Sequence, residues 1–384
     1  MSQLFTEEGF LKLMRGRMAK KTKPGKMSPA DLRAMINKKA GMEVAHSLVG
    51  ENPTEVKEWI PTGSRWLNSI ICRGKIAGIP VGKISEIAGL EATGKSFLAA
   101  QVAANAQTMG MQVIYFDSES AIDPSFLSKA GCDLETLLYV QAYSVEFVLE
   151  TIETIMSSGQ ERTLFIWDSM AFTPATGDLA GDFNPQSSMA LKARILGKAM
   201  SKLLISVANT KSTLLVLNQL KSNITRLPHE MLTTPYVTPG GKSLNYAYSL
   251  RIWLTGRKAK KSFVVNDKGY RIGSEVKAKI EKSRFGTAGR TCNFRILWGD
   301  DVAIRDEESW FAAIKDSEHV SQAGAWYSLK MKDGTVKKFQ ASKWLESLED
   351  SVFRDRVIEI FDEEVIMKFA SQEGDAKSFY EVDE

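Results

Sequence analysis

The eight residues Gly89-Leu90-Glu91-Ala92-Thr93-Gly94-Lys95-Ser96 match the pattern G-x-x-x-x-G-K-[ST] in full. In this pattern the glycines let backbone N–H groups point at phosphate oxygens, the lysine places its charge on the β and γ phosphates, and the serine hydroxyl ligates Mg²⁺. An apolar run precedes the loop and an alanine-rich segment follows it, so the next helix turns its positive end towards the anion. The motif therefore predicts a site for ATP with Mg²⁺. The candidate nucleotide-binding residues here are Gly89, Glu91, Ala92, Thr93, Gly94, Lys95, Ser96 and Phe97.

Short apolar runs alternate with longer helical patterns on both sides of this loop. The expected strands are 81–88, 112–116, 164–167 and 213–217, and the expected helices are 96–109, 145–157 and 190–209. Alternation of this kind is typical of crossover units and a parallel sheet. Further strand-like runs lie at 248–254, 262–265, 275–280 and 292–297. The sequence thus predicts an α/β fold around a twisted, mostly parallel sheet.

Two of the expected strands end in acidic residues, at the edge of a parallel sheet where ligands collect. Asp168 follows the run 164–167, and with Ser96 it is our candidate for holding Mg²⁺. Asp117 and Glu119 follow the run 112–116, and we take Glu119 as the base that activates water for hydrolysis. The sequence leaves open that Asp168 is only a turn residue, and that Asp117 or Glu119 caps the following helix.

Several motifs, taken in order along the chain, resemble the RecA family of strand-exchange recombinases. Besides the phosphate loop they are 61–64 (PTGS), 78–89 (GIPVGKISEIAG), 117–119 (DSE), 121–124 (AIDP), 168–169 (DS) and 218–219 (NQ). The string EKSR at 281–284 is most similar to the phage (UvsX-type) branch, whereas the phosphate loop is more similar to the bacterial one. The resemblance covers roughly residues 55–300. It implies a RecA-like ATPase core with an N-terminal arm and a small C-terminal α/β domain.

The resemblance also implies roles for single residues. Asp123 and Phe126 would lie near the adenine, and Gln219 would sense the γ-phosphate and relay the nucleotide state to the DNA loops. Lys282 and Arg284 would reach across a subunit interface to the ATP of a neighbour, where they offset charge on the transferring phosphoryl group as an arginine finger does. The implied catalytic set is Glu119, Lys95, Gln219, Lys282 and Arg284.

Two long segments between expected elements, 173–188 and 222–241, are candidates for DNA contact. Connections of that length are usually functional or disordered, and binding of single strands needs cations along the backbone together with groups that meet the bases. The candidate residues in and beside them are Met189, Lys192, Arg194, Lys198, Lys221, Arg226 and Lys242. The residues alone leave open that both segments are ordinary surface loops with scattered charge.

By the resemblance these segments are the family's two DNA-binding loops. Met189 and Arg194 match family contact positions, and Gly240 and Gly241 would offer backbone N–H groups to phosphates. The chain departs from the family pattern in two places. No residue of the second segment can be identified as the one that inserts between bases, and 245–247 reads Asn-Tyr-Ala where bacterial members have Lys-Phe-Tyr.

The whole chain has the composition of a globular protein, with 384 residues, 43% apolar and 25% charged, which excludes a disordered or fibrous chain. No apolar run reaches the roughly 18 residues that span a bilayer, and three separated cysteines exclude a disulfide scaffold or a zinc ribbon. We therefore expect a cytoplasmic protein of a bacterial or phage-infected cell. The expected domains are a basic N-terminal arm for oligomerisation at 1–54, the ATPase core at 55–300, and a small C-terminal domain with an acidic tail at 301–384.

The expected function is ATP-dependent homologous pairing and strand exchange by a helical filament on single-stranded DNA, with ATP and Mg²⁺ as cofactors. The expected partners are single-stranded DNA, homologous duplex DNA and further copies of the chain. A loading or mediator protein and a single-strand binding protein are further candidates. Two alternatives stay open: a hexameric helicase motor built on the same core, and a regulatory ATP-binding switch without catalysis.

Overall fold

The structure is a computed structural model that describes residues 27–41, 43–47, 55–179, 188–223, 235–256, 262–298 and 302–366. For residues 188–190, 242 and 302 it describes the backbone only. The chain divides into two compact units, Met1–Glu55 and Val56–Glu384.

The first unit contains one helix among its described residues, α2 (Pro29–Ala40). Ser28 caps its amino end, since the Ser28 hydroxyl accepts from Asp31 N and the Asp31 carboxylate accepts from Ser28 N. Such a capping box fixes where a helix begins, and Gly41 ends this one in the left-handed conformation. No residue of α2 is buried within the chain, so its own caps rather than packing define it.

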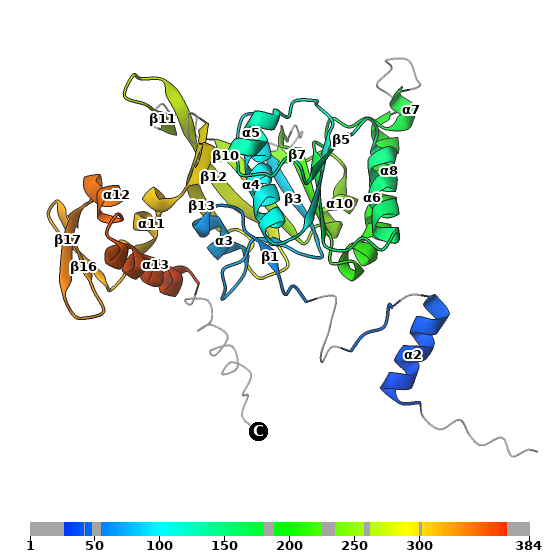
Figure 1. The fold of residues 1–384 in the computed structure, drawn as a ribbon, viewed down its shortest axis with the longest axis horizontal. Coiled ribbons are helices and arrows are strands. Elements are labelled where there is room, and N and C mark those ends of the chain that lie inside the picture. The colour runs from blue at the N-terminus through cyan, green and yellow to red at the C-terminus, as the bar shows by residue number, and fades with distance from the viewer. Residues whose placement is uncertain are drawn as a thin grey trace, which may run out of the picture. The chain divides into compact units, whose positions relative to one another are not determined.

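The second unit is organised around one ten-stranded sheet (Figure 1), in the order β14-β13-β12-β10-β3-β7-β6-β4-β5, with β11 paired to β12. Its strands are β3 (Ile84–Gly89), β4 (Gln112–Asp117), β5 (Leu137–Gln141), β6 (Thr163–Asp168), β7 (Thr213–Gln219), β10 (Leu250–Gly256), β11 (Phe263–Val265), β12 (Arg271–Ser283), β13 (Thr291–Trp298) and β14 (Val302–Arg305). Neighbours from β10 to β5 run parallel, and those from β10 to β14 antiparallel. The predicted α/β fold with a mostly parallel sheet is confirmed.

Helices cover both faces of the parallel part, and every residue of β3 and β6 is buried. Strands covered on both faces read as continuous apolar runs, which is the pattern that the sequence has here. The two hydrophobic cores involve α3 (Arg65–Ile71), α4 (Lys95–Thr108) and α5 (Pro124–Lys129) on one face, and α6 (Val145–Ser157), α8 (Ser188–Asn209) and α10 (Lys242–Ala247) on the other. Because the parallel strands end at one edge, the residues that follow them gather there.

The expected elements of the core match the observed ones closely, with three instructive differences. β3 begins later than expected, because residues 81–83 form a turn in which Gly82 has a φ of 76°. β12 is longer than expected at both ends, because it pairs with β10, β11 and β13 along its length. The edge strand β5 was not expected at all, since none of its residues is buried.

A small three-stranded sheet follows the core, formed by β15 (Val320–Ala323), β16 (Trp326–Lys330) and β17 (Val336–Gln340). It packs with α11 (Glu307–Ile314), α12 (Trp344–Ser347) and α13 (Ser351–Val365) around an aromatic core made by Trp310, Phe339, Trp344, Phe353 and Phe361. Arg65 of α3 forms an ion pair with Asp362 of α13. The small C-terminal α/β domain is confirmed, and residues 367–384 of its expected acidic tail lie outside the described residues.

The remaining short elements are β1 (Trp59–Ile60), β2 (Ile79–Pro80), α7 (Thr176–Leu179), β8 (Lys221–Ser222), β9 (Tyr236–Val237) and η2 (Ala341–Lys343). Within the described part of the chain, no helix has both the length and the apolar character that crossing a membrane requires.

Candidate nucleotide site and the surfaces around it

The phosphate loop connects β3 to α4, and its curl requires glycine at both ends. A Cβ placed on Gly94 would lie 2.1 Å from Ile296 Cδ1, and one on Gly89 would lie 2.4 Å from Thr93 Oγ1. Gly94 also has a φ of 81°, which side chains other than that of glycine rarely adopt. The loop therefore lies close against β13.

Lys95 lies inside the curl that the loop makes. Its ammonium donates to the carbonyl oxygens of Gly89 at 3.3 Å and Leu90 at 2.9 Å. Burial lowers the pKa of Lys95, while the nearby charges of Asp168 and Glu119 act in the opposite direction. The three charged side chains that the sequence assigned to one site are thus neighbours in space.

Ser96 and Asp168 meet beneath the loop. Ser96 Oγ donates to Asp168 Oδ2 at 2.7 Å, and Tyr115 OH donates to the same oxygen at 2.9 Å. Burial raises the pKa of Asp168, and the hydrogen bonds from Ser96 and Tyr115 act against that rise. Among the described residues, no three or more His, Cys, Asp or Glu side chains are arranged so that they alone could hold a metal ion. One hydroxyl beside one carboxylate still fits Mg²⁺, because this ion keeps several waters and takes its other ligands from substrate phosphates.

The two acids after β4 have different surroundings. The Asp117 carboxylate accepts the backbone N–H groups of Glu119 at 2.9 Å, Ala121 at 3.0 Å and Ile122 at 3.2 Å, so it organises the loop. Glu119 Oε1 instead accepts from the Ser169 hydroxyl at 3.0 Å. Neither acid caps the following helix α5, because Asp123 does so. The role of Glu119 as the base stays a prediction.

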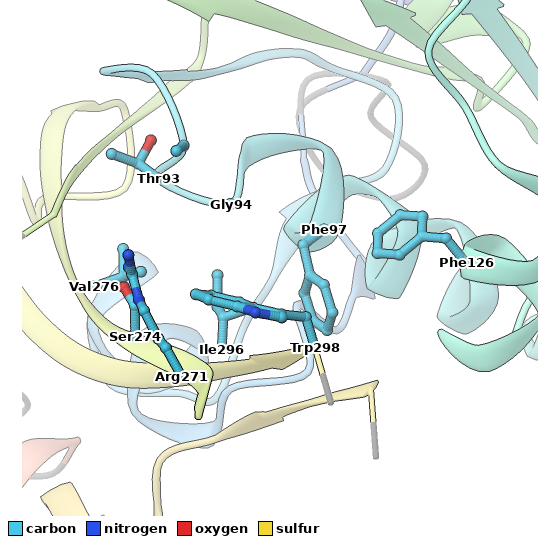
Figure 2. A pocket seen from close by; sticks show the side chains of 10 residues that line it. Thr93, Gly94, Phe97, Phe126, Arg271, Ser274, Val276, Ile296 and Trp298 are labelled. Carbon is cyan, nitrogen blue, oxygen red and sulfur yellow. The ribbon is translucent and has the colours of Figure 1, made fainter. Parts of the chain in front are cut away.

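A cavity of about 350 Å³ opens beside the phosphate loop (Figure 2). The loop forms one wall, and side chains of β12 and β13 form the wall that faces it. The lining residues are Ala92, Thr93, Gly94, Phe97, Phe126, Arg271, Ser274, Val276, Ile296 and Trp298. Pockets that are mostly apolar with a few polar groups are typical of sites for small ligands, and this one adjoins the phosphate loop. It suits the base and sugar of a nucleotide whose phosphates lie in the loop. Glu91 of the loop is exposed.

The two residues expected near the adenine differ in position. Phe126 lines the cavity and packs edge-on against Phe97, with ring centroids 5.6 Å apart. Asp123 caps the amino end of α5, where it accepts from Ser125 N at 2.8 Å and from Ser125 Oγ at 2.8 Å. These bonds lower the pKa of Asp123. A contact of Asp123 with a base stays a prediction.

Trp298 and Arg271 form part of the facing wall, and no sequence pattern singled them out (Figure 2). The Arg271 guanidinium lies 4.0 Å from the ring centroid of Phe263 and 5.1 Å from that of Trp298. Stacking of a guanidinium on aromatic rings is favourable and fixes the side chains. One signal in the sequence could have found Trp298: it is an aromatic residue at the end of an expected strand, directly before Gly299 and two acids.

Known proteins resemble this chain over most of its length. A family model for the RecA N-terminal domain matches residues 30–303. The RecA protein of Fusobacterium nucleatum subsp. nucleatum is 34% identical over 300 residues, which are 78% of this chain and 75% of that protein. The RecA protein of Mannheimia haemolytica is 32% identical over 289 residues, 75% of this chain and 74% of that protein. This chain belongs to the RecA family.

RecA-family proteins are in general DNA-dependent ATPases that bind ATP with Mg²⁺ and act in DNA recombination and repair. The family resemblance that the motifs carried is thereby confirmed. The relatives named above are bacterial, so the likeness of 281–284 to the phage branch stays a prediction.

Lys282 and Arg284 are the two cations that were expected to act on the ATP of a neighbouring subunit. Both lie away from the phosphate loop of their own chain. Lys282 pairs with Arg251 across β12 and β10, and Arg251 pairs with Glu86 of β3. Glu86 precedes Gly89 by three residues, about 10 Å along an extended strand. The Lys282 ammonium donates to Asn245 O, at the end of α10.

Arg284 is also directed towards α10, since its guanidinium donates to Tyr246 O at 2.8 Å. Gln219 has the opposite placement. It pairs in register with Gly89, so the proposed γ-phosphate sensor lies beside the first residue of the phosphate loop.

The first DNA-loop candidate, 173–188, includes α7, and its residues 180–187 lie outside the described part. The Lys192 ammonium is half-buried and donates to Ala171 O at 2.9 Å and Thr173 O at 2.6 Å. It therefore ties α8 to the segment that leaves β6. Arg194 and Lys198 of α8 are exposed.

The glycine pair of the second candidate loop lies against α8. A Cβ placed on Gly241 would lie 3.6 Å from Ala193 Cβ, and one on Gly197 would lie 2.9 Å from Ser243 Oγ. Gly240 has a φ of 108°, and a Cβ there would lie 3.1 Å from Met170 Cε. The end of the second candidate loop thus lies against the helix that follows the first.

The other DNA-binding candidates are described to different degrees. Lys221 is exposed on β8, whose pairing with β9 joins the ends of the second loop. Arg226 lies outside the described residues. Met189 is the second residue of α8 and Lys242 is the first of α10, and only the backbone of each is described. DNA contact by any of these residues stays a prediction.

Proposed function

We propose that this RecA-family chain is an ATP-dependent recombinase that forms a helical filament on single-stranded DNA and exchanges strands with homologous duplex DNA. The observation that carries the proposal is the placement of Lys282 and Arg284. They lie towards the amino end of β3, whereas their own phosphate loop lies at its carboxyl end. Cations in that position serve the ATP of an adjacent subunit, so that one chain alone lacks a complete site.

Hydrolysis of ATP then uses residues that lie around the phosphate loop. Glu119 takes a proton from a water whose oxygen attacks the γ-phosphorus, and the bond to the β–γ bridging oxygen breaks to leave ADP and phosphate. Ser169 keeps the Glu119 carboxylate in place, since its hydroxyl donates to Oε1 at 3.0 Å. Lys95 places positive charge on the phosphates, and Ser96 with Asp168 would hold Mg²⁺. The ion supplies neutralisation of the charge on the β and γ phosphates.

A buried network supports coupling between this site and DNA. Asn218, next to Gln219, donates through Nδ2 to Glu86 Oε1 at 2.9 Å and to Pro239 O at 3.1 Å. Arg251 Nε donates to Glu86 Oε2 at 2.6 Å, and its Nη2 donates to Thr238 Oγ1 at 2.8 Å.

Removing one partner from such a network leaves a buried charge unpaired, which costs several kcal/mol. A movement at the end of β7 is therefore transmitted to the segment that leads into Gly240 and Gly241. ATP shifts the filament between two states by binding one of them more tightly.

Electron microscopy tests the proposal directly. The chain is incubated with single-stranded DNA, Mg²⁺ and a non-hydrolysable ATP analogue, and we expect extended helical filaments that disassemble with ADP. Closed six-membered rings would instead support a helicase motor. A chain that stays monomeric under these conditions would contradict the proposal, and so would an assembly that does not depend on nucleotide.

Strand exchange is the second part of the test. Filaments are given a homologous duplex, and the displaced strand is measured with a heterologous duplex as the control. Displacement with both duplexes, or with neither, would contradict a recombinase. A loading protein and a single-strand binding protein are proposed partners, to be assayed by their effect on the rate. A location in the cytoplasm stays a prediction of the sequence.

A further inference from the structure

Tyr115 is a buried residue of β4 whose hydroxyl is aimed at the candidate Mg²⁺ site. Its side chain is 0% exposed, and Tyr115 OH donates to Asp168 Oδ2 at 2.9 Å. In the sheet Tyr115 pairs with Ile166, so Asp168 is its diagonal neighbour on β6. Diagonal neighbours on one face of a sheet are within reach of an aromatic side chain. The bond joins the interior of the core to the carboxylate beneath the phosphate loop.

Asp168 accepts two hydrogen bonds on the same oxygen, one from Ser96 Oγ and one from Tyr115 OH. The two donors differ in whether they would also bind the ion. Ser96 Oγ is also the candidate ligand of the ion, so the hydroxyl has a second partner once Mg²⁺ is bound. The Tyr115 hydroxyl, in contrast, is not a candidate ligand of Mg²⁺. This hydroxyl is buried, and its one hydrogen bond among the described residues goes to this carboxylate. Tyr115 is therefore the constant support of this carboxylate.

We propose that Tyr115 is a positioning residue for Mg²⁺, because its hydroxyl holds the Asp168 carboxylate turned towards Ser96. The inference rests on the proposed nucleotide-binding function. In a Tyr115→Phe variant the ring fills the same space, but Asp168 keeps a single donor and is free to turn. Loss of a group that orients a metal ligand from behind typically costs 10- to 100-fold in metal affinity or activity.

The test compares the full chain with its Tyr115→Phe variant by titration with a fluorescent ADP analogue, first in EDTA and then with rising Mg²⁺. We expect unchanged affinity in EDTA, and a Mg²⁺ concentration for half-maximal tightening that is roughly 10-fold higher in the variant. Electron paramagnetic resonance of bound Mn²⁺ gives the same comparison without turnover. A variant with the Mg²⁺ dependence of the wild type would overturn the proposal.

Tyr248→Phe is the matched control. Tyr248 is also fully buried, but its hydroxyl has no hydrogen-bond partner among the described residues, and it belongs to the core on the other face of the sheet. Removing this hydroxyl is expected to leave the Mg²⁺ titration unchanged. If both variants shift the titration equally, the effect is a general loss of packing and the proposal fails.

A double-mutant cycle tests whether Tyr115 acts through Asp168. In an Asp168→Asn background, Tyr115→Phe should change the Mg²⁺ titration no further, since coupled residues are not additive. Full additivity would refute the role.

Thermal unfolding shows whether the Tyr115→Phe variant folds. If it does not fold, ¹⁹F NMR of a labelled chain tests the same proposal. 3-Fluorotyrosine placed at position 115 alone keeps the hydroxyl, and its ¹⁹F resonance should shift when Mg²⁺ joins the bound nucleotide. A resonance that ignores Mg²⁺ would overturn the proposal.

Failure of the proposed function has a different outcome. The wild-type chain itself would then bind neither the ADP analogue nor Mn²⁺, and the positioning role would fall with it. Wild-type binding that depends on Mg²⁺, combined with an identical titration of Tyr115→Phe, overturns only the role of Tyr115.

Discussion

Ser96 Oγ and Asp168 Oδ2 lie 2.7 Å apart although the residues are 72 positions apart in the chain. Ser96 belongs to the first turn of α4, and Asp168 ends β6. β6 is not the neighbour of β3 in the sheet, because β7 lies between them. The crossover helix α4 therefore brings the phosphate loop to the end of a strand that β3 never touches, and the nucleotide site exists only in the folded core.

Replacement of Lys95 by alanine should weaken ATP binding. The ammonium is the charge nearest the loop carbonyls, and hydrogen bonds to charged groups contribute about 1.5–3 kcal/mol. We expect a loss of roughly 10- to 100-fold in affinity for a fluorescent ATP analogue, and loss of nucleotide-dependent DNA binding. Lys211→Ala, at the opposite end of β7, is the control and should bind normally. ATP-stimulated filaments of Lys95→Ala would refute the assignment of the loop.

Glu119→Gln should bind ATP and stop turnover. Glutamine keeps the size of the side chain and can still accept from Ser169, but it takes no proton from water. Removal of a general base typically costs 10²- to 10⁴-fold in rate, so we expect a loss of about that size in phosphate release at saturating ATP. Ser169→Ala should lower the rate less and leave the KM for ATP unchanged, since it only loosens Glu119. Wild-type turnover by Glu119→Gln would place the base elsewhere.

Trp298→Ala should weaken binding of the base but not of the phosphates. Trp298 lines the cavity opposite the phosphate loop, and stacking of a base on an aromatic ring contributes about 1–3 kcal/mol. Isothermal calorimetry should show weaker ATP binding, by roughly 10-fold or more, and unchanged binding of inorganic triphosphate. Trp326→Ala, an exposed tryptophan of the C-terminal sheet, is the control. An equal loss for both ligands would contradict this use of the cavity.

Mixing two inactive variants should restore activity if Lys282 acts on a neighbour. Glu119→Gln lacks the base but provides Lys282, and Lys282→Ala lacks the cation but provides a working base. In a head-to-tail assembly some interfaces then combine both intact halves, about a quarter of them at equal amounts and random order. The measurement is the ATPase rate of the mixture against each variant alone. No recovery in mixed filaments would show that Lys282 acts within its own subunit or not at all.

Lys192 should make the free energy of unfolding rise with pH above neutrality. Its half-buried position lowers its pKa from the usual 10.5 to about 8, with Asp178 acting against the shift and Lys221 adding to it. Between these two values the unfolded chain binds more protons at Lys192 than the folded chain, so stability increases with pH there and is flat below pH 8 from this group.

Urea unfolding from pH 7 to 10 measures this effect as the difference between the wild type and Lys192→Met. The difference should grow in favour of the wild type as pH rises through about 8. Lys198→Met, at an exposed position of the same helix, should show no such trend. A pH-independent difference for Lys192→Met would contradict the lowered pKa.

Local patterns predicted much of this protein. The phosphate loop could be predicted because phosphate binding itself requires this spacing of glycine, lysine and serine. Both ends of α6 were predicted correctly because its apolar positions repeat with the helical period. β5 was missed because an edge strand with exposed residues has no such pattern. Asp117 and Glu119 looked alike in sequence, and only their hydrogen bonds separate the residue that organises the loop from the one that faces Ser169.

The amino-acid sequence by itself determined the family, the loop that binds phosphates and the succession of buried strands, because each of these depends on residues close together in the chain. Only the tertiary structure decided that Tyr115 supports Asp168, that Trp298 closes the cavity, and that Lys282 lies far from its own phosphate loop. Those relationships depend on strand order and register. Strand order in a sheet is set by the packing of the whole core, and a shift of one residue in register would turn every one of these side chains to the other face.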